Sequence, residues 1–141
     1  MIPDGRYTLL NHTADLKIEI YGRDLPDLFT NACFALFDNI ADLSRVTGDA
    51  TRTITIAGED TADLMINWLR ELLALWTVEG LLIKSARIKG ISETSLTADI
   101  LFDSYSPARH VLKTDIKAVT YHQGSVSSGP DGWTARVVVD V

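Results

Sequence analysis

Residues 133–141, at the end of the chain, form a mostly hydrophobic run, rich in valine, that closes on Asp140 and Val141. β-branched side chains favour the pleated, half-buried surface of a sheet. Chain ends are usually poorly ordered, whereas a terminal strand that packs into a sheet would hold Asp140 and Val141 in fixed positions. The fold is therefore expected to contain a sheet that takes up this strand, with a carboxylate at the strand's end.

A second acidic residue, Asp15, follows His12 in the segment His-Thr-Ala-Asp and precedes an alternating apolar and polar run at residues 16–20. If this run and the C-terminal strand lie side by side, the side chains of Asp15 and Asp140 meet the terminal carboxylate. Hard cations such as Ca²⁺ and Mg²⁺ prefer such all-oxygen clusters. A metal site at this end of the sheet is thus a hypothesis, and it depends on a strand pairing that the sequence alone does not establish.

The final hairpin relates Asp140 to the strand before it. Turn residues at 127–132 centre the hairpin near Pro130. In an antiparallel hairpin the residue numbers of paired residues add up to a nearly constant value. Asp140 is therefore expected opposite Thr120, to within about two residues, with Lys117 a close neighbour. Alternation along the strand then places Asp140 and Arg136 together on the polar face.

Composition limits the classes of function. The length of 141 residues indicates one domain over residues 1–141. The net charge of −6 argues against direct binding of nucleic acid, whose affinity rests largely on lysine and arginine. Because the chain has neither an apolar run that could span a bilayer nor the layout of a signal peptide, we expect a cytoplasmic protein without a membrane partner. Cys33, the one cysteine, is interpreted as a buried hydrophobic residue.

Two amphipathic helices are predicted. One spans residues 25–40, with Asp24 as its N-cap, and the other opens at residues 59–63 and runs to Trp76 ahead of Gly80. No internal repeat is apparent. Strands outnumber helices and do not alternate regularly with them, so we expect an α+β fold, with two helices packed on a mainly antiparallel sheet in a single-domain two-layer sandwich. The segments predicted as strands are 17–21, 52–57, 81–83, 86–89, 95–102, 115–126 and 133–141.

The polar candidates also have ordinary structural interpretations. Spacing alone favours a solvated cluster of ion pairs for Asp15, Asp140 and Lys117. His12 and His122 could bind a metal or transfer protons, but an isolated histidine beside a strand is more often hydrogen-bonded and structural. The spacing of these residues does not decide between a binding role and an ordinary structural role.

Motifs for enzymatic chemistry are missing from the sequence. It contains no glycine-rich phosphate loop, no His-Glu-x-x-His helix, no Gly-x-Ser-x-Gly turn and no Cys-x-x-Cys pair. His110 lies in a predicted loop, where a functional and a solvated side chain are equally expected. A small metal-dependent phosphohydrolase is the enzymatic alternative, with His12 or His122 as the general base. A protein without catalytic activity fits the sequence better.

Five segments, in order along nearly the whole chain, resemble the archease family. The most specific are Lys-Ala-Val-Thr-Tyr-His within residues 116–122 and the terminal Asp-Val. The resemblance implies a non-enzymatic activator of the RtcB-type RNA ligase, one that promotes guanylylation and multiple turnover of the ligase in tRNA splicing and RNA repair. It also implies an alternative, a chaperone-like modulator of a tRNA methyltransferase. The five segments are residues 12–15, 28–32, 63–73, 116–122 and 133–141.

The same resemblance implies a metal site and assigns its residues. Asp15, Asp140 and an oxygen of Val141 would hold a divalent ion, with Ca²⁺ preferred and Mg²⁺ or Mn²⁺ as substitutes. The physical argument from the terminal strand and the His-Thr-Ala-Asp segment selects the same residues. With the resemblance added, a metal site is preferred over a solvated cluster of ion pairs. The candidates for contacts with a partner or nucleotide are His12, Lys117 and His122.

Overall fold

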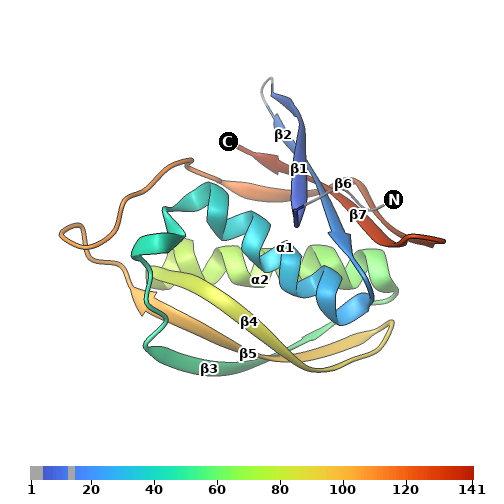
Figure 1. Cartoon of the computed structure of the whole chain (residues 1–141), viewed down its shortest axis with the longest axis horizontal. Helices are drawn as coiled ribbons and strands as arrows, with labels where there is room; N and C mark the ends of the chain where they lie inside the picture. The colour runs from blue at the N-terminus through green and yellow to red at the C-terminus, as the bar shows by residue number, and fades with distance from the viewer. Residues whose placement is uncertain (1–4, 13–14) are drawn as a thin grey trace.

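The computed structural model describes residues 5–12 and 15–141, with the side chains of all of these except 11, 12, 122 and 123. Within these ranges the chain forms two α-helices and two antiparallel sheets, ordered β1-β2-β7-β6 and β3-β5-β4 (Figure 1). The predicted α+β fold is confirmed. Within the described ranges, no helix has both the length and the apolarity needed to cross a membrane. The elements are β1 (Tyr7–His12), β2 (Asp15–Gly22), α1 (Leu25–Ile40), the 3₁₀ helix η1 (Leu43–Arg45), β3 (Ala50–Ala57), α2 (Thr61–Glu79), β4 (Leu81–Ile91), β5 (Ser95–Ser104), β6 (Ala118–Gly129) and β7 (Gly132–Asp140).

The strands differ from the sequence prediction in three respects. Strand β1 was not predicted, because the adjacent Leu9 and Leu10 interrupt the alternation of apolar and polar residues. In the structure both leucines are exposed. The two predicted segments at 81–83 and 86–89 form the single strand β4, in which the register shifts between Ile83 and Ser85. The strands also divide into two sheets rather than one, because β5 is followed by an irregular loop instead of a strand that would join them.

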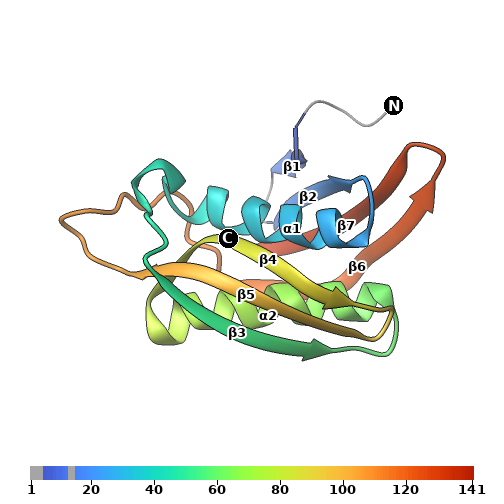
Figure 2. The same ribbon diagram turned by 60° about the horizontal axis from the view of Figure 1, so that its bottom comes forward.

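The helices lie between the two sheets and contact both of them. Helix α1 packs on β4 of one sheet and β2 of the other, while α2 packs on β6 and on β3 and β4. Figures 1 and 2 show the sheet β3-β5-β4 along one side of the helix pair and β2, β7 and β6 along the other. Trp68 of α2 is fully buried and its indole N–H donates to the carbonyl of Phe29 in α1 at 2.9 Å. The core is therefore continuous from sheet to sheet through the helices.

Both helices begin with the pattern Gly-x-Asp-x-x-Asp-Leu-x-x-Asn, at residues 22–31 and 58–67. In each copy the first aspartate caps the helix by accepting the backbone N–H of the second, at 2.9 Å and 2.8 Å. The second aspartate accepts the N–H of the residue before the first. The asparagine side chain donates to a carbonyl at or next to the end of the preceding strand, at 2.8 Å and 2.9 Å. The sequence therefore contains a short repeat that sequence analysis missed, because each copy covers only ten residues around the start of a helix.

The glycine that opens each copy allows the strand end to approach the helix closely. A Cβ on Gly22 would lie 2.4 Å from the backbone nitrogen of Leu28, and one on Gly58 would lie 2.6 Å from the backbone nitrogen of Leu64. Because the opposing atoms belong to helical backbone, neither a rotamer change nor a small side-chain shift relieves the overlap. These two contacts set the distance between each strand and the helix that follows it.

Replacing Gly22 or Gly58 with alanine is expected to lower the free energy of unfolding by about 2 kcal/mol or more, as overpacking against fixed backbone does. Gly90→Ala is the matched control, since a Cβ there meets nothing within 4 Å. Urea denaturation followed by circular dichroism measures the three variants. Equal stability of Gly22→Ala and Gly90→Ala would contradict the close packing of β2 on α1.

Candidate metal centre

Strand β7 brings Asp15 and Asp140 together. It lies between β2 and β6, and Asp15 of β2 is the direct cross-strand partner of Asp140. On the other side Asp140 pairs with Ala118, two positions from the predicted Thr120. The backbone N–H of Lys117 donates to the carbonyl of Asp140 at 2.8 Å. The pairing on which the metal hypothesis depends is therefore present, and Lys117 is next to it as expected.

The acidic pair is exposed and electrostatically unfavourable by itself. Asp15, Asp140 and Lys117 are all exposed, and Val141 is 41% exposed. Direct cross-strand partners have Cβ atoms only about 5 Å apart, and like charges at that spacing destabilise a sheet. A bound cation would remove this repulsion. The available donors are carboxylate and main-chain oxygens, which suit a hard divalent ion.

The other two predicted contact residues, His12 and His122, can be described only by their backbone. The backbone of His12 pairs with Leu16 in the β1–β2 hairpin, and His122 belongs to a segment of β6 that interrupts the pairing with β7. The side chains of both histidines fall outside the described part of the structure. Among the residues that are described, no three side chains of His, Cys, Asp or Glu form a group that could hold a metal. Asp15 and Asp140 thus form a pair of carboxylates, and a metal ion bound there would need further oxygen ligands from the main chain, the terminal carboxylate or a partner.

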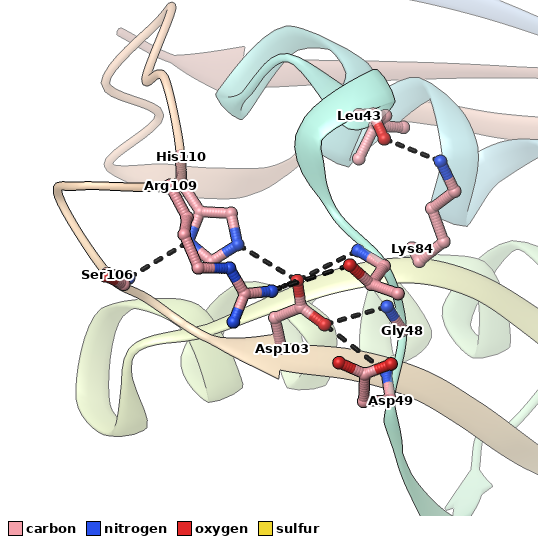
Figure 3. Close-up of polar contacts among 9 residues, drawn as sticks. Leu43, Gly48, Asp49, Lys84, Asp103, Ser106, Arg109 and His110 are labelled. Atoms are coloured by element: carbon pink, nitrogen blue, oxygen red, sulfur yellow. Dashed lines mark hydrogen bonds and ion pairs between the residues drawn. The ribbon is translucent and has the colours of Figure 1, made fainter.

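A second polar cluster, which sequence analysis missed, surrounds Asp103 at the end of β5. The Asp103 side chain is 2% exposed and accepts the backbone N–H groups of Thr47, Gly48 and Asp49 at 2.9, 2.7 and 3.3 Å. It also accepts a hydrogen bond from Arg109 at 3.1 Å, as Figure 3 shows. The available signal was an acidic residue at the end of an apolar strand, but the partners are distant in sequence.

His110 completes this cluster and is neither solvated nor free to react. Its ring is fully buried, and its Nδ1 accepts the backbone N–H of Ser106 at 2.9 Å. The other ring nitrogen, Nε2, therefore carries a proton in the neutral ring and donates to Asp103 at 2.9 Å. Tyr105 stacks on the ring with centroids 6.0 Å apart. The interpretation of His110 as a functional or solvated loop residue is replaced by a structural role, namely to anchor this loop.

The loop at residues 105–117 carries the chain from one sheet to the other. From its anchor at Asp103 it runs along the C-terminal end of α1, where Lys113 and Thr114 donate backbone N–H groups to the carbonyls of Ile40 and Asn39 at 2.8 and 2.9 Å. Ile116 is fully buried. The loop then ends at Lys117, whose backbone contacts Asp140. The position of Lys117 beside the acidic pair therefore depends on a chain segment tied down along its length.

Comparisons with known proteins agree with this architecture. A model described as the Archease protein family matches residues 7–141. A protein named archease from Methanosarcina barkeri is 38% identical, with 96% of each chain covered, and one from Pyrococcus abyssi is 35% identical, with 96% of this chain and 99% of that protein covered. The solution structure of Protein 1598 of Methanobacterium thermoautotrophicum has a TM-score of 0.81 at 28% identity and covers 96% of this chain and 98% of that one.

A more distant solved structure has the same fold. The crystal structure from Thermotoga maritima, described as "an archease, possible chaperone", has a TM-score of 0.64 at 22% identity and covers 95% of this chain and 96% of that one. At this level of identity the likeness supports the fold alone.

Asp103 predicts how stability depends on pH. Burial acts to raise the pKa of this carboxyl. Hydrogen bonds from the His110 ring and from the backbone N–H groups of residues 47–49 outweigh the effect of burial and lower the pKa to about 2. A carboxyl with a lowered native pKa stabilises the fold above its unfolded pKa of about 4 and loses that contribution as the pH falls toward 2. The loss amounts to about 2 kcal/mol.

We therefore expect the unfolding free energy of the unmodified protein to fall between pH 5 and pH 2.5 by about 2 kcal/mol more than that of Asp103→Asn. The variant itself is expected to be less stable at neutral pH, because its amide places a donor among donors. Asp115→Asn, at an exposed loop position, is the control and should follow the unmodified protein. Parallel pH curves for the unmodified protein and Asp103→Asn would contradict the assignment. Urea titrations at each pH provide the measurement.

Proposed function

The chain belongs to the archease protein family, and from this premise we propose that it is a non-enzymatic activator of an RtcB-type RNA ligase that works through a divalent ion held at the end of strands β2 and β7. The observation that carries the proposal is the direct pairing of Asp15 with Asp140. Two exposed carboxylates opposite one another form a site that gains stability when a cation binds. The activity on the ligase is what the family resemblance implies.

The proposed metal ligands are the carboxylates of Asp15 and Asp140 and a main-chain or terminal oxygen of Val141. Ca²⁺ is the preferred ion, with Mg²⁺ and Mn²⁺ as substitutes, because all of the donors are oxygen atoms. When bound, the ion would neutralise the repulsion between the two aspartates and could accept an oxygen atom of an acidic or phosphate group of the partner as a further ligand. The exposure of both aspartates supports this, since a docking site has to be reachable.

Lys117, His12 and His122 are the proposed contacts to the partner or to its nucleotide. The argument is strongest for Lys117, whose backbone N–H bonds to the carbonyl of Asp140 and whose side chain is exposed. A lysine at this point could bind a phosphate oxygen or a carboxylate that also approaches the ion. The anchored loop 105–117 supports the role, because a contact residue acts best when its backbone is held in place.

A chaperone-like modulator of a tRNA methyltransferase is the second candidate. It is the alternative that the family resemblance implies, and the solved protein from Thermotoga maritima is itself described as a possible chaperone. The two candidates predict different partners. Affinity purification of the tagged protein from its own cells, followed by mass spectrometry, separates them: recovery of the RNA ligase supports the activator, and recovery of a methyltransferase without the ligase contradicts it.

The metal site predicts a joint loss of two properties. Asp15→Asn and Asp140→Asn each remove one ligand charge and keep the side-chain shape, so Ca²⁺ affinity measured by calorimetry is expected to fall at least about tenfold. Multiple-turnover ligation by the purified ligase with GTP should lose its stimulation in the same variants. Both aspartates are exposed, so the fold should be retained, as thermal melting can verify.

Glu93→Gln is the matched control, because it removes one exposed carboxylate from the β4–β5 turn of the other sheet. It should bind Ca²⁺ and stimulate the ligase like the unmodified protein. Unchanged Ca²⁺ binding in both aspartate variants would eliminate the site. Equal ligation rates with and without the unmodified protein would eliminate the activator function.

A further inference from the structure

The sheet β1-β2-β7-β6 has a hollow on the face that is turned away from the helices. Alternation directs Ala135, Val137 and Val139 into the core, where they are at most 1% exposed, and turns Arg136 and Val138 to the opposite face. The hollow has a volume of about 440 Å³. This lies within the range of about 300–1,000 Å³ that is typical of small-molecule sites. Its lining residues are Leu10, Lys17, Ile18, Ser125, Arg136, Val137 and Val138.

Irregular pairing at both edges of the sheet shapes this hollow. On one edge Leu10 is left between the pairs Leu9 with Ile18 and Asn11 with Lys17. On the other edge residues 121–124 of β6 stand opposite Val137 alone. Such bulges bend a sheet and increase its twist locally, and they are frequent beside functional sites. The same bulges break up both edge strands, which makes the addition of a partner's strand to either edge less favourable.

Cationic groups line the hollow although the protein as a whole carries a net charge of −6. Lys17 is the cross-strand partner of Val138, and none of the ion pairs between described residues includes it. Arg136 is held by its Nε, which donates to Glu19 at 2.6 Å, while Glu19 also accepts the hydroxyl of Tyr21 at 3.0 Å. This contact uses one of the five guanidinium N–H donors. No described residue bonds to the two terminal amino groups of Arg136, so both are left for a ligand.

The remaining lining residues supply the complementary parts of a ligand site. Ser125 contributes a hydroxyl that can donate to an anion, and Leu10 and Val138 provide apolar surface on the same side of the sheet. A site of this kind, with an apolar wall and a few polar groups that orient the ligand, is usual for small molecules. Arginine and lysine together with a hydroxyl favour a phosphate group.

We propose that this hollow binds the phosphate group of a small phosphorylated molecule, a mononucleotide being the class that fits, through Lys17, Arg136 and Ser125. Leu10 and Val138 contact the apolar part of the ligand. The hollow lies on the same face as the acidic pair, since Lys17 is two residues from Asp15 and Val138 two from Asp140, about 7 Å along the strands. It is nevertheless a separate site, built from different residues, and it requires neither the metal nor the ligase.

Calorimetry of the full chain in EDTA and low salt tests the proposal, with GMP, AMP, inorganic phosphate and guanosine as probes. The nucleotides are expected to bind saturably and guanosine not to bind. Lys17→Gln and Arg136→Gln should each weaken nucleotide binding at least about tenfold, because each removes a charged hydrogen-bond donor. Lys17→Gln breaks no ion pair among the described residues, so the fold is expected to be retained, and thermal melting verifies this. Lys89→Gln, an exposed position on β4 of the other sheet, is the charge-matched control and should bind normally.

The outcomes separate this site from the proposed metal centre. Asp140→Asn should bind the nucleotides as well as the unmodified protein or more tightly, because it removes a negative charge from the same face; loss of binding in that variant would assign the ligand to the acidic end and overturn the proposal. Equal binding of guanosine and GMP, equal weakening by Lys89→Gln, or no saturable binding of any phosphate probe would overturn it as well. None of these measurements uses the ligase or a metal ion.

Discussion

The position of β7 between β2 and β6 is the constraint on which the rest of the molecule depends. Its inward side chains are almost completely buried against the helices, and its backbone pairs with both neighbours along nearly its whole length. A strand paired on both edges cannot fray as a terminal segment usually does. The end of the strand is therefore paired on both sides, and the acidic pair takes its geometry directly from the sheet register.

Two further constraints carry this order across the molecule. The repeated helix start, with its glycine, two aspartates and asparagine, sets how each helix approaches the strand before it, so α1 and α2 enter the core in the same way. The cluster around Asp103 and His110 then ties the end of β5 to the segment before β3 and anchors the loop 105–117. The loop is also hydrogen-bonded to the end of α1, so its backbone is held in place between the two sheets as far as Lys117.

Charged residues follow one another along β2 and β7 on the outer face of the four-stranded sheet. The two aspartates lie opposite one another at the end of these strands, Lys17 lies two residues further along β2, and Arg136 is bound to Glu19 two residues beyond Lys17. The two like charges opposite one another cost free energy at the acidic end, and a bound cation would offset that cost. The fold itself does not need these charges, since the opposite face of the same strands supplies the apolar core. The charges on this face are therefore available for binding, which is the physical basis of both proposals.

Local patterns in the sequence determined the helices, their caps and the exposed orientation of Asp140, because periodicity, capping and alternation act over a few residues. The final hairpin was predicted to within two positions, since a tight turn sets the register of the strands that it joins. The tertiary structure alone decided that β2 pairs with β7, that the strands divide into two sheets, and that Asp103 is buried among backbone donors. These contacts join residues far apart in the chain, and their energies come from packing and desolvation that no local pattern encodes. For the same reason the hollow beside Lys17 could not be predicted, because bulges in two edge strands shape it and only the assembled sheet brings them to one face.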